Sequence, residues 1–268
     1  MKKFEIDPDR KIFRKYIPEA KFLNEVAMSQ RAKLLSESTK LFRVPAILNI
    51  EKEQGFVDLE LIENCKTFRQ FYISNAKFGA NKKQKDLLIS HFSQLGKSLW
   101  QIHQEDMNDD LQKTSFPEGF FDERFANDHV FIHGDFTMRN ILIDSEKNEP
   151  YIIDWSISPL FDFSANFGPR YWDLTFFISS LFLFSPSTLF SYKSKTEYAK
   201  AFLTAYIVEI DVDKAVFVRK LQQFLMEYNY YKLYDSKLKQ RSLIKKVIQS
   251  YSIKKLYRFA NDLDKIMT

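Results

Sequence analysis

The stretch over residues 131–155 constrains the fold of this chain more than any other part of it. It reads FIHGDFTMRNILIDSEKNEPYIIDW, and its apolar segments ILI and YII are separated by a polar turn. Short apolar runs bounded by turn formers are typical of buried strands, so we predict a β-hairpin here. Asp135 and Asn140 precede this hairpin and Asp154 follows it directly, so we expect the hairpin to bring the three side chains together.

Two carboxylates and a carboxamide in this arrangement suit metal-assisted phosphoryl transfer. Mg²⁺ takes oxygen ligands, usually one or two from the protein and the others from water and substrate phosphates. Asn140 would supply a carbonyl oxygen and Asp154 a carboxylate, whereas Asp135 would orient an acceptor hydroxyl and take its proton. Protein kinases fill these roles with the same D-x-x-x-x-N spacing, followed by a hairpin and another aspartate. If the three residues were only turn and cap residues, nothing would require this spacing.

The segments HGDFTMRNILID and YIIDW resemble the aminoglycoside phosphotransferase and choline kinase family of small-molecule kinases, within the protein-kinase-like superfamily. The resemblance implies an α+β, protein-kinase-like bilobal fold. Residues 1–63 would form a small, truncated and β-rich N-lobe with one helix. Residues 64–268 would form a mainly helical C-lobe that carries the catalytic loop, the metal site and the acceptor-binding region. The resemblance also implies an enzyme, a phosphotransferase that uses ATP and Mg²⁺ and takes an alcohol group as acceptor.

In this family, a lysine on an N-lobe strand contacts the nucleotide phosphates, and a glutamate on the next helix holds that lysine. Lys15 is the candidate for the lysine, in a β-hairpin that we predict over residues 2–17. Glu25 is the candidate for the glutamate, in a helix that we predict over residues 20–36. Arg14 stays an alternative to Lys15, because a register shift of one residue exchanges which side chain faces the cleft.

The end of the next predicted strand is a candidate for nucleotide binding. The sequence LELIEN over residues 59–64 resembles the link between the lobes in this family, where main-chain groups bind adenine. By this resemblance, Glu60 and Ile62 would bind the cofactor through their backbone N–H and C=O groups. An ordinary strand end is the alternative interpretation of the same residues.

The N-terminal region departs from the family pattern in one respect. The N-lobe of this family begins with two strands around a Gly-rich loop that covers the phosphates, but this sequence has no glycine before Gly55. The covering loop is therefore absent or rebuilt, and the Asp7–Arg10 turn is one place where it could be rebuilt.

Periodicity predicts further elements around these motifs. The helix over residues 20–36 is expected to be amphipathic and to bury Phe22, Val26, Ala27 and Leu34, which lie on recurring turns. We also predict strands over residues 44–50 and 56–62, helices over residues 85–104 and 171–184, a loop over 156–170, and helices from residue 198 onward.

Composition indicates where such a protein would work. The single Cys65 excludes an intramolecular disulfide bond, and the segment MKKFEIDPDR contains no apolar signal sequence. The longest apolar-rich run, Tyr171–Phe184, is too short to span a bilayer. We therefore expect a cytoplasmic protein.

Charge at the C-terminal end bears on the acceptor. Residues 213–268 contain 13 Lys and Arg against 5 Asp and Glu, an excess larger than the net charge of +5 of the whole chain. A basic region favours a neutral, anionic or membrane-borne acceptor over a polycationic aminoglycoside. The expected acceptor is a sugar or an amino alcohol. The segment Tyr228–Phe259 places aromatic residues among lysines and is a candidate for peripheral contact with an anionic membrane, with a solvated helix face as the alternative.

Two further functions compete with a kinase of free small molecules. A kinase that phosphorylates a lipopolysaccharide or other glycan sugar at the inner membrane face would use the basic region. A kinase-like binding protein without activity would explain the missing Gly-rich loop. A nucleic-acid partner is not expected, because the basic residues form no recognised binding motif, and the sequence does not fix the oligomeric state.

Overall fold

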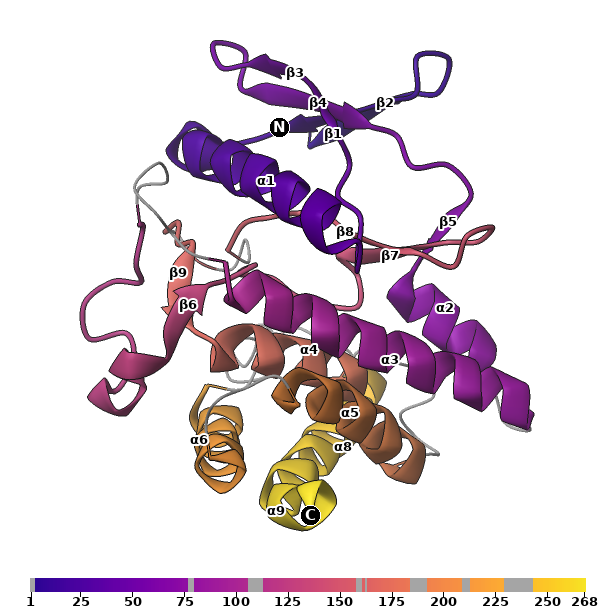
Figure 1. The fold of residues 1–268 in the computed structure, drawn as a ribbon, viewed down its shortest axis with the longest axis vertical. Coiled ribbons are helices and arrows are strands. Elements are labelled where there is room, and N and C mark those ends of the chain that lie inside the picture. The colour runs from indigo at the N-terminus through magenta and orange to yellow at the C-terminus, as the bar shows by residue number, and fades with distance from the viewer. Residues whose placement is uncertain are drawn as a thin grey trace. The chain divides into compact units, whose positions relative to one another are not determined.

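The computed structural model describes residues 3–76, 80–105, 113–157, 161, 163–183, 192–208, 213–228 and 243–268 (Figure 1). It has the α+β architecture that the sequence predicts, with a small β-sheet part near the N-terminus and a helical part toward the C-terminus. The elements in chain order are β1 (Phe4–Asp7), β2 (Ile12–Tyr16), α1 (Glu19–Thr39), β3 (Ile47–Glu51), β4 (Phe56–Glu60), β5 (Cys65–Thr67), α2 (Phe68–Asn75), α3 (Lys82–His103), the 3₁₀-helix η1 (Glu123–Asp128), β6 (His129–Phe131), β7 (Ile141–Asp144), β8 (Pro150–Ile152), β9 (Phe167–Pro169), α4 (Tyr171–Leu183), α5 (Tyr192–Ile207), α6 (Lys214–Glu227), α8 (Leu243–Asn261) and α9 (Leu263–Met267).

The chain forms two compact units, which are described separately. The first consists of Met1–Thr67, Gln101–Asp135 and Arg139–Pro169. The second consists of Phe68–Trp100, Phe136–Met138 and Arg170–Thr268. The lobe boundary at residue 63 stays a prediction.

The first unit begins with a four-stranded antiparallel sheet in the order β1-β2-β4-β3. The predicted hairpin over residues 2–17 is confirmed, and its turn is closed by Lys11 N–H donating to the Pro8 carbonyl at 3.2 Å. Lys15 lies opposite Phe4 on β1 and Val57 on β4, so these three side chains share one face of the sheet.

Helix α1 packs under the same face, as Figure 1 shows. Its Phe22 joins Ile17 and Val57 in a buried cluster. The expectation that Leu34 is buried is wrong, because 60% of it is exposed. The buried stripe of the helix runs through Phe22, Glu25, Met28, Ala32 and Leu35. Phe22 was therefore assigned correctly, whereas Glu25 and Ala32 weaken the apolar signal of this stripe and Leu34 was wrongly included in it.

The predicted hairpin after Asn140 is confirmed as β7 and β8, and β5 extends it to a three-stranded sheet. Asp144 sets its turn, since its Oδ1 accepts hydrogen bonds from the N–H groups of Glu146 (2.8 Å) and Lys147 (3.0 Å). The strand before the HGD residues, β6, belongs to a separate pair with β9. Part of the loop predicted over residues 156–170 is therefore a strand.

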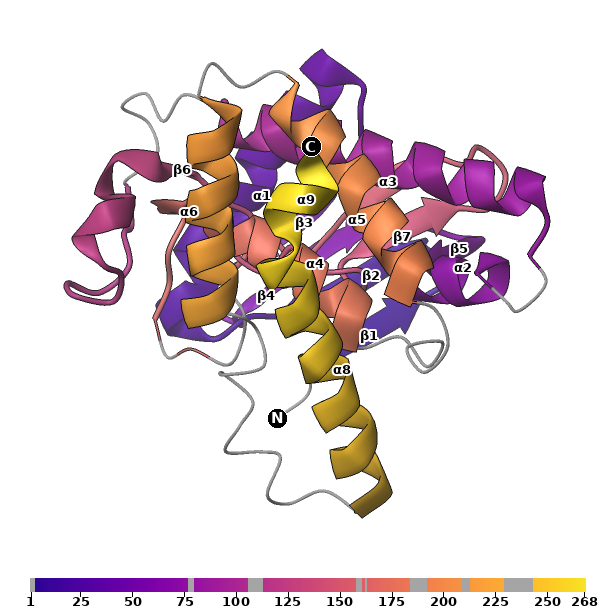
Figure 2. The ribbon, with the colours of Figure 1, turned by 90° about the horizontal axis from the view of Figure 1, so that it is seen from below.

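The second unit is helical and has an aromatic core. Helix α4 contacts α5, α6 and α8 (Figure 2). Phenylalanine and tyrosine rings pack between the helices, with centroid distances of 4.3 Å for Phe177–Phe202 and 5.2 Å for Phe92–Tyr198. Within the described residues, no helix has both the length and the apolar character required to cross a bilayer. Of the basic segment Tyr228–Phe259, residues 229–242 lie outside the described part, as do the side chains of residues 243–248.

Gly96 allows α3 to approach α5 closely in this unit. A Cβ atom at this position would collide with the backbone carbonyl of Phe202. The contact is between main chains, so no side-chain rotation can relieve it.

We therefore expect Gly96→Ala to lower the free energy of unfolding by about 1–3 kcal/mol, even though alanine favours helix formation more than glycine does. Denaturant unfolding followed by circular dichroism measures this change. The exposed Lys97→Ala, on the same helix, is the matched control and should change stability by less than about 0.5 kcal/mol. Equal stability of Gly96→Ala and the wild type would show that the two helices are not in close contact here.

Candidate active site

The HGD residues follow β6 in a turn that requires glycine at its centre. Gly134 has φ of 88°, which residues with a side chain rarely adopt. A Cβ atom on Gly134 would also lie 2.9 Å from the backbone nitrogen of Ile157. The turn that carries Asp135 is therefore packed against the backbone that follows Asp154.

His133 connects this turn to the second strand of the hairpin. Its side chain is fully buried, and its Nδ1 accepts a hydrogen bond from the Asp135 N–H at 3.2 Å. Its Nε2 lies 3.0 Å from the Ile153 carbonyl oxygen. Because a carbonyl only accepts, Nε2 carries the proton and the ring is neutral. The sequence motif contained His133, but its role as a brace could not be read from the motif.

Asn140 makes hydrogen bonds to Asp135 on one side and to Ile153 on the other. Its Nδ2 donates to the Asp135 carbonyl at 2.9 Å and to Asp135 Oδ2 at 3.0 Å. Its own main-chain carbonyl accepts from the Ile153 N–H at 2.9 Å. The peptide groups of Ile153 are thus bound by Asn140 on one side and by His133 on the other. Since Asn140 Nδ2 is engaged by Asp135, Oδ1 is the atom of this side chain that can bind a cation.

Asp154 directly follows Ile153 and adopts an uncommon backbone conformation. Its φ is 66°, in the left-handed region that costs a non-glycine residue about 1–2 kcal/mol. The next residue, Trp155, is buried, and its Nε1 donates to the Ile152 carbonyl at 3.1 Å. Trp155 is thus anchored in the core, whereas the Asp154 side chain is 35% exposed.

Lys15 joins Asp154 to helix α1. Its Nζ donates to the carboxylates of both Glu25 and Asp154. Burial disfavours the charged ammonium, but Asp154 and Glu25 outweigh it and raise the pKa of Lys15. Burial likewise opposes the charge on Asp154, and the Lys15 ammonium nevertheless lowers the pKa of this carboxyl group. Burial raises the pKa of Glu25, and Lys15 acts against that rise.

The alternative residue Arg14 lies on the opposite face of β2. Its Nε is 2.7 Å from Asp58 Oδ1, and its guanidinium stacks 3.9 Å from the centroid of the Phe56 ring. The structure therefore brings Lys15, rather than Arg14, next to Glu25.

The predicted adenine-binding link has some of its main-chain groups already engaged. The Glu60 N–H donates to the Ala46 carbonyl at 2.8 Å, and the Ile62 carbonyl accepts from the Cys65 thiol at 3.2 Å. The Glu60 N–H is therefore engaged within the sheet, whereas the Ile62 carbonyl keeps a second lone pair for another donor.

The donor atoms suit a hard divalent cation. Asn140 Oδ1 and the Asp154 carboxylate are the oxygen donors that Mg²⁺ prefers. The hydrogen bond from the Ile153 N–H to the Asn140 carbonyl holds Asn140 beside Ile153, the residue that directly precedes Asp154. Asp135 is held beside them through Asn140 Nδ2.

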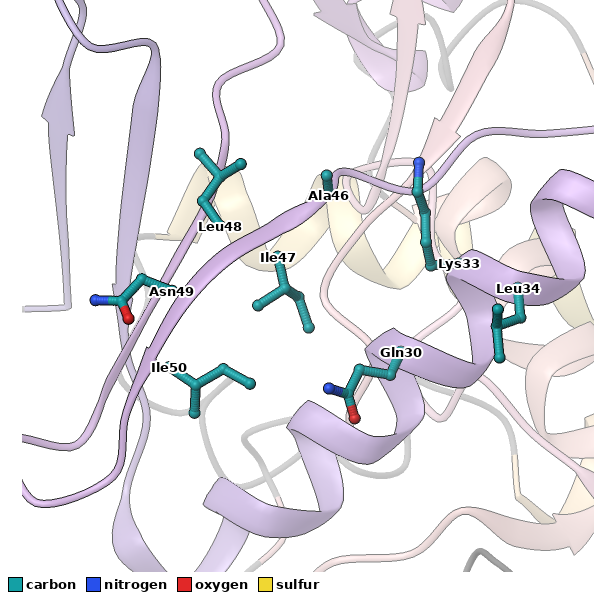
Figure 3. A pocket seen from close by; sticks show the side chains of 8 residues that line it. All are labelled: Gln30, Lys33, Leu34, Ala46, Ile47, Leu48, Asn49 and Ile50. Carbon is teal, nitrogen blue, oxygen red and sulfur yellow. The ribbon is translucent and has the colours of Figure 1, made fainter.

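A separate groove lies between α1 and β3, with a volume of about 760 Å³ (Figure 3). It is lined by Gln30, Lys33, Leu34, Ala46, Ile47, Leu48, Asn49 and Ile50. None of the predicted site residues lines this groove.

Comparison with known families supports the resemblance that the HGD motif indicated. The sequence model described as "Phosphotransferase enzyme family" (APH) matches residues 81–215, about half of the chain. This chain belongs to the APH phosphotransferase family. Asp135, Asn140 and Asp154 lie inside the matched range, whereas Lys15 and Glu25 lie outside it.

Solved structures show the same fold. The amicoumacin kinase hAmiN, in complex with AMP-PNP, Ca²⁺ and Ami, is 13% identical to this chain and has a TM-score of 0.56. The similarity covers 98% of this chain and 84% of that kinase. A glucosamine kinase is also 13% identical to this chain and has a TM-score of 0.50. The similarity covers 96% of this chain and 71% of that kinase.

A curated relative is similar over a shorter region. The Dictyostelium discoideum protein named "Probable inactive serine/threonine-protein kinase samkD" is 30% identical over 101 residues. These residues make up 37% of this chain and 16% of the length of that protein.

The buried charges around Lys15 lead to a pH-dependent prediction. Lys15→Met leaves Glu25 and Asp154 without their ammonium partner, so we expect the free energy of unfolding at pH 7 to fall by about 3 kcal/mol. Lys15 lowers the pKa of Asp154, so its stabilisation is present above the ordinary carboxyl pKa and is lost as the pH falls through the folded pKa.

The stability gap between the wild type and Lys15→Met should accordingly be largest above about pH 5 and narrow as the pH falls from about 5 toward about 2, through the lowered pKa of Asp154. Urea unfolding at several pH values measures the gap. A gap that is constant over this range would mean that Lys15 does not neutralise the two carboxylates.

Proposed function

We propose that this chain is an ATP- and Mg²⁺-dependent phosphotransferase that transfers the γ-phosphate to a hydroxyl group of a small molecule. The observation that carries the proposal is the hydrogen-bond network that connects Asp135, Asn140 and the residue before Asp154. Asn140 binds Asp135, and Asn140 and His133 both bind Ile153, which directly precedes Asp154. Membership of the APH family and a fold shared with small-molecule kinases support it.

The contacts of each residue support one role in the proposed reaction. The Asp135 carboxylate is oriented by Asn140 Nδ2, so it can align an acceptor hydroxyl and take its proton as the new O–P bond forms. Asn140 Oδ1 and Asp154 are the residues that would hold Mg²⁺. When bound, this ion neutralises charge on the phosphate oxygens. Lys15 stays charged beside Glu25 and can donate to the phosphates, and main-chain groups of Glu60 and Ile62 would bind the base.

Such a site works mainly through positioning and charge. Phosphoryl transfer passes through a loose transition state, so the protein contributes little covalent chemistry. The residues described here are already fixed by the fold before substrates bind, which reduces the reorganisation that the reaction needs.

The acceptor that we propose is a sugar or an amino alcohol. The basic C-terminal region disfavours a polycationic aminoglycoside. A sugar acceptor agrees with the glucosamine kinase that shares this fold. A sugar on a lipopolysaccharide or another membrane-borne glycan is the variant of this proposal in which the basic region also contacts anionic lipid.

A binding protein without kinase activity is the second candidate. The similarity to the samkD protein and the absence of any glycine before Gly55 favour it. The presence of Asp135, Asn140 and Asp154 in one hydrogen-bonded site favours the enzyme instead. ADP release from Mg-ATP, measured across a panel of sugars, amino alcohols, aminoglycosides and lipid-linked glycans, separates the two: release with none of them would contradict the enzyme.

Asp135→Asn is expected to abolish phosphotransfer while leaving the affinity for Mg-ATP within about threefold of the wild type, because the amide cannot accept the proton but keeps the shape of the side chain. Initial rates and equilibrium binding measure the two effects. Retained turnover would remove Asp135 from the proposed role.

Asp154→Ala is expected to weaken binding of ATP by at least about tenfold in the presence of Mg²⁺ and to leave binding in EDTA nearly unchanged, because the variant loses a metal ligand. Calorimetric titration measures both affinities. Asp144→Ala, which removes a carboxylate from the turn of the same hairpin, is the matched control and should retain the Mg²⁺ dependence. An unchanged affinity in Asp154→Ala would place the metal elsewhere.

A further inference from the structure

The first turns of α1 are hydrogen-bonded to the segment that leads into β9. Lys21 Nζ donates to the Phe161 carbonyl at 2.9 Å. Asn24 Nδ2 donates to Ser164 Oγ at 2.7 Å, and Asn24 Oδ1 accepts from Asn166 Nδ2 at 2.9 Å. Both ends of the Asn24 carboxamide are therefore held by residues about 140 positions away in the sequence.

Asn166 connects this helix to the strand that carries the HGD turn. Its side chain is fully buried, and its Oδ1 accepts from the Thr114 N–H at 2.9 Å. Its main-chain N–H donates to the Thr114 carbonyl, and its carbonyl accepts from the Ile132 N–H at 3.0 Å. Ile132 directly precedes His133, so a single residue binds both α1 and the approach to Asp135.

Asn24 is adjacent to Glu25, the partner of Lys15. Asparagine inside a helix is less favourable than alanine by about 0.5 kcal/mol, so helix stability does not account for it here. A rotation of α1 about its axis would break the Asn24 hydrogen bonds and would also move the Glu25 carboxylate away from Lys15. The orientation of Glu25 thus depends on contacts that its neighbour makes.

We propose that Asn24 and Asn166 are a positioning pair that fixes the phosphate-binding residues Lys15 and Glu25 relative to the turn that carries Asp135. The inference rests on the proposed phosphotransferase function. Neither asparagine touches a reacting atom; the pair acts by keeping the Glu25–Lys15 contact and the Asp135 turn in register.

The test compares Asn24→Ala with Gln30→Ala, a matched loss of an amide side chain on the same helix. Both substitutions favour the helix, so neither should unfold it. Asn24→Ala should lower kcat by about ten- to a hundredfold and weaken binding of AMP-PNP, since small misplacements of catalytic groups cost that much. Gln30→Ala should change either quantity by less than about twofold.

Two further variants separate positioning from general structure. Asn24→Asp keeps both hydrogen bonds, because the Ser164 hydroxyl can donate to a carboxylate as well as accept, so it should retain most of the activity. In a Glu25→Gln background, Asn24→Ala should cause little additional loss, because both changes disturb the same contact. Losses that multiply, or an Asn24→Ala enzyme with the activity of the wild type, would overturn the inference.

A readout without turnover keeps this test separate from the test of the proposed function. Amide hydrogen exchange over Glu19–Met28 should be faster in Asn24→Ala than in the wild type and unchanged in Gln30→Ala. A wild-type protein that turns over no acceptor would refute the proposed function, whereas unchanged exchange in Asn24→Ala would refute the positioning pair alone.

Discussion

The two hydrogen bonds to Ile153 are the constraint on which the rest of the site depends. The Ile153 N–H donates to the Asn140 carbonyl, and the Ile153 carbonyl accepts from the neutral imidazole of His133. A main-chain segment bound on both sides cannot move without breaking buried hydrogen bonds, each of which is costly to lose. Asp154 follows immediately in a left-handed conformation, and the residue after it, Trp155, is anchored in the core.

The charges at the site are arranged at a cost to stability. Lys15 lies between Glu25 and Asp154, and moving each ion out of water costs several kcal/mol before the attraction between them is counted. Apolar residues of similar volume would often serve stability equally well. A lysine held charged beside a partly exposed carboxylate would instead serve the proposed binding of phosphate and metal. The strained backbone at Asp154 agrees with the same view.

The sequence predicted the parts of this structure that depend on local patterns. The two hairpins follow from apolar runs and turn residues, and both are present. Local patterns could not separate Lys15 from Arg14, because alternating strand residues differ only in the face that pairing gives them. Leu34 was misassigned because a glutamate and an alanine occupy the buried stripe. Asn166 had no sequence signature, since its partner in α1 is 142 residues away and side-chain amide contacts have no period.

The central claim is that Asn140 and Asp154 hold a divalent cation together with the nucleotide. Paramagnetic line broadening tests this most directly: Mn²⁺ and ATP are titrated into isotope-labelled protein, and the amide and side-chain signals are followed. Signals of Asn140 and Asp154 are expected to broaden first, and only when ATP is present with the metal, while those of Arg14 and Asp58, on the opposite face of β2 and β4, broaden at higher Mn²⁺ concentrations. Broadening that begins elsewhere, or that is uniform over the chain, would contradict the claim.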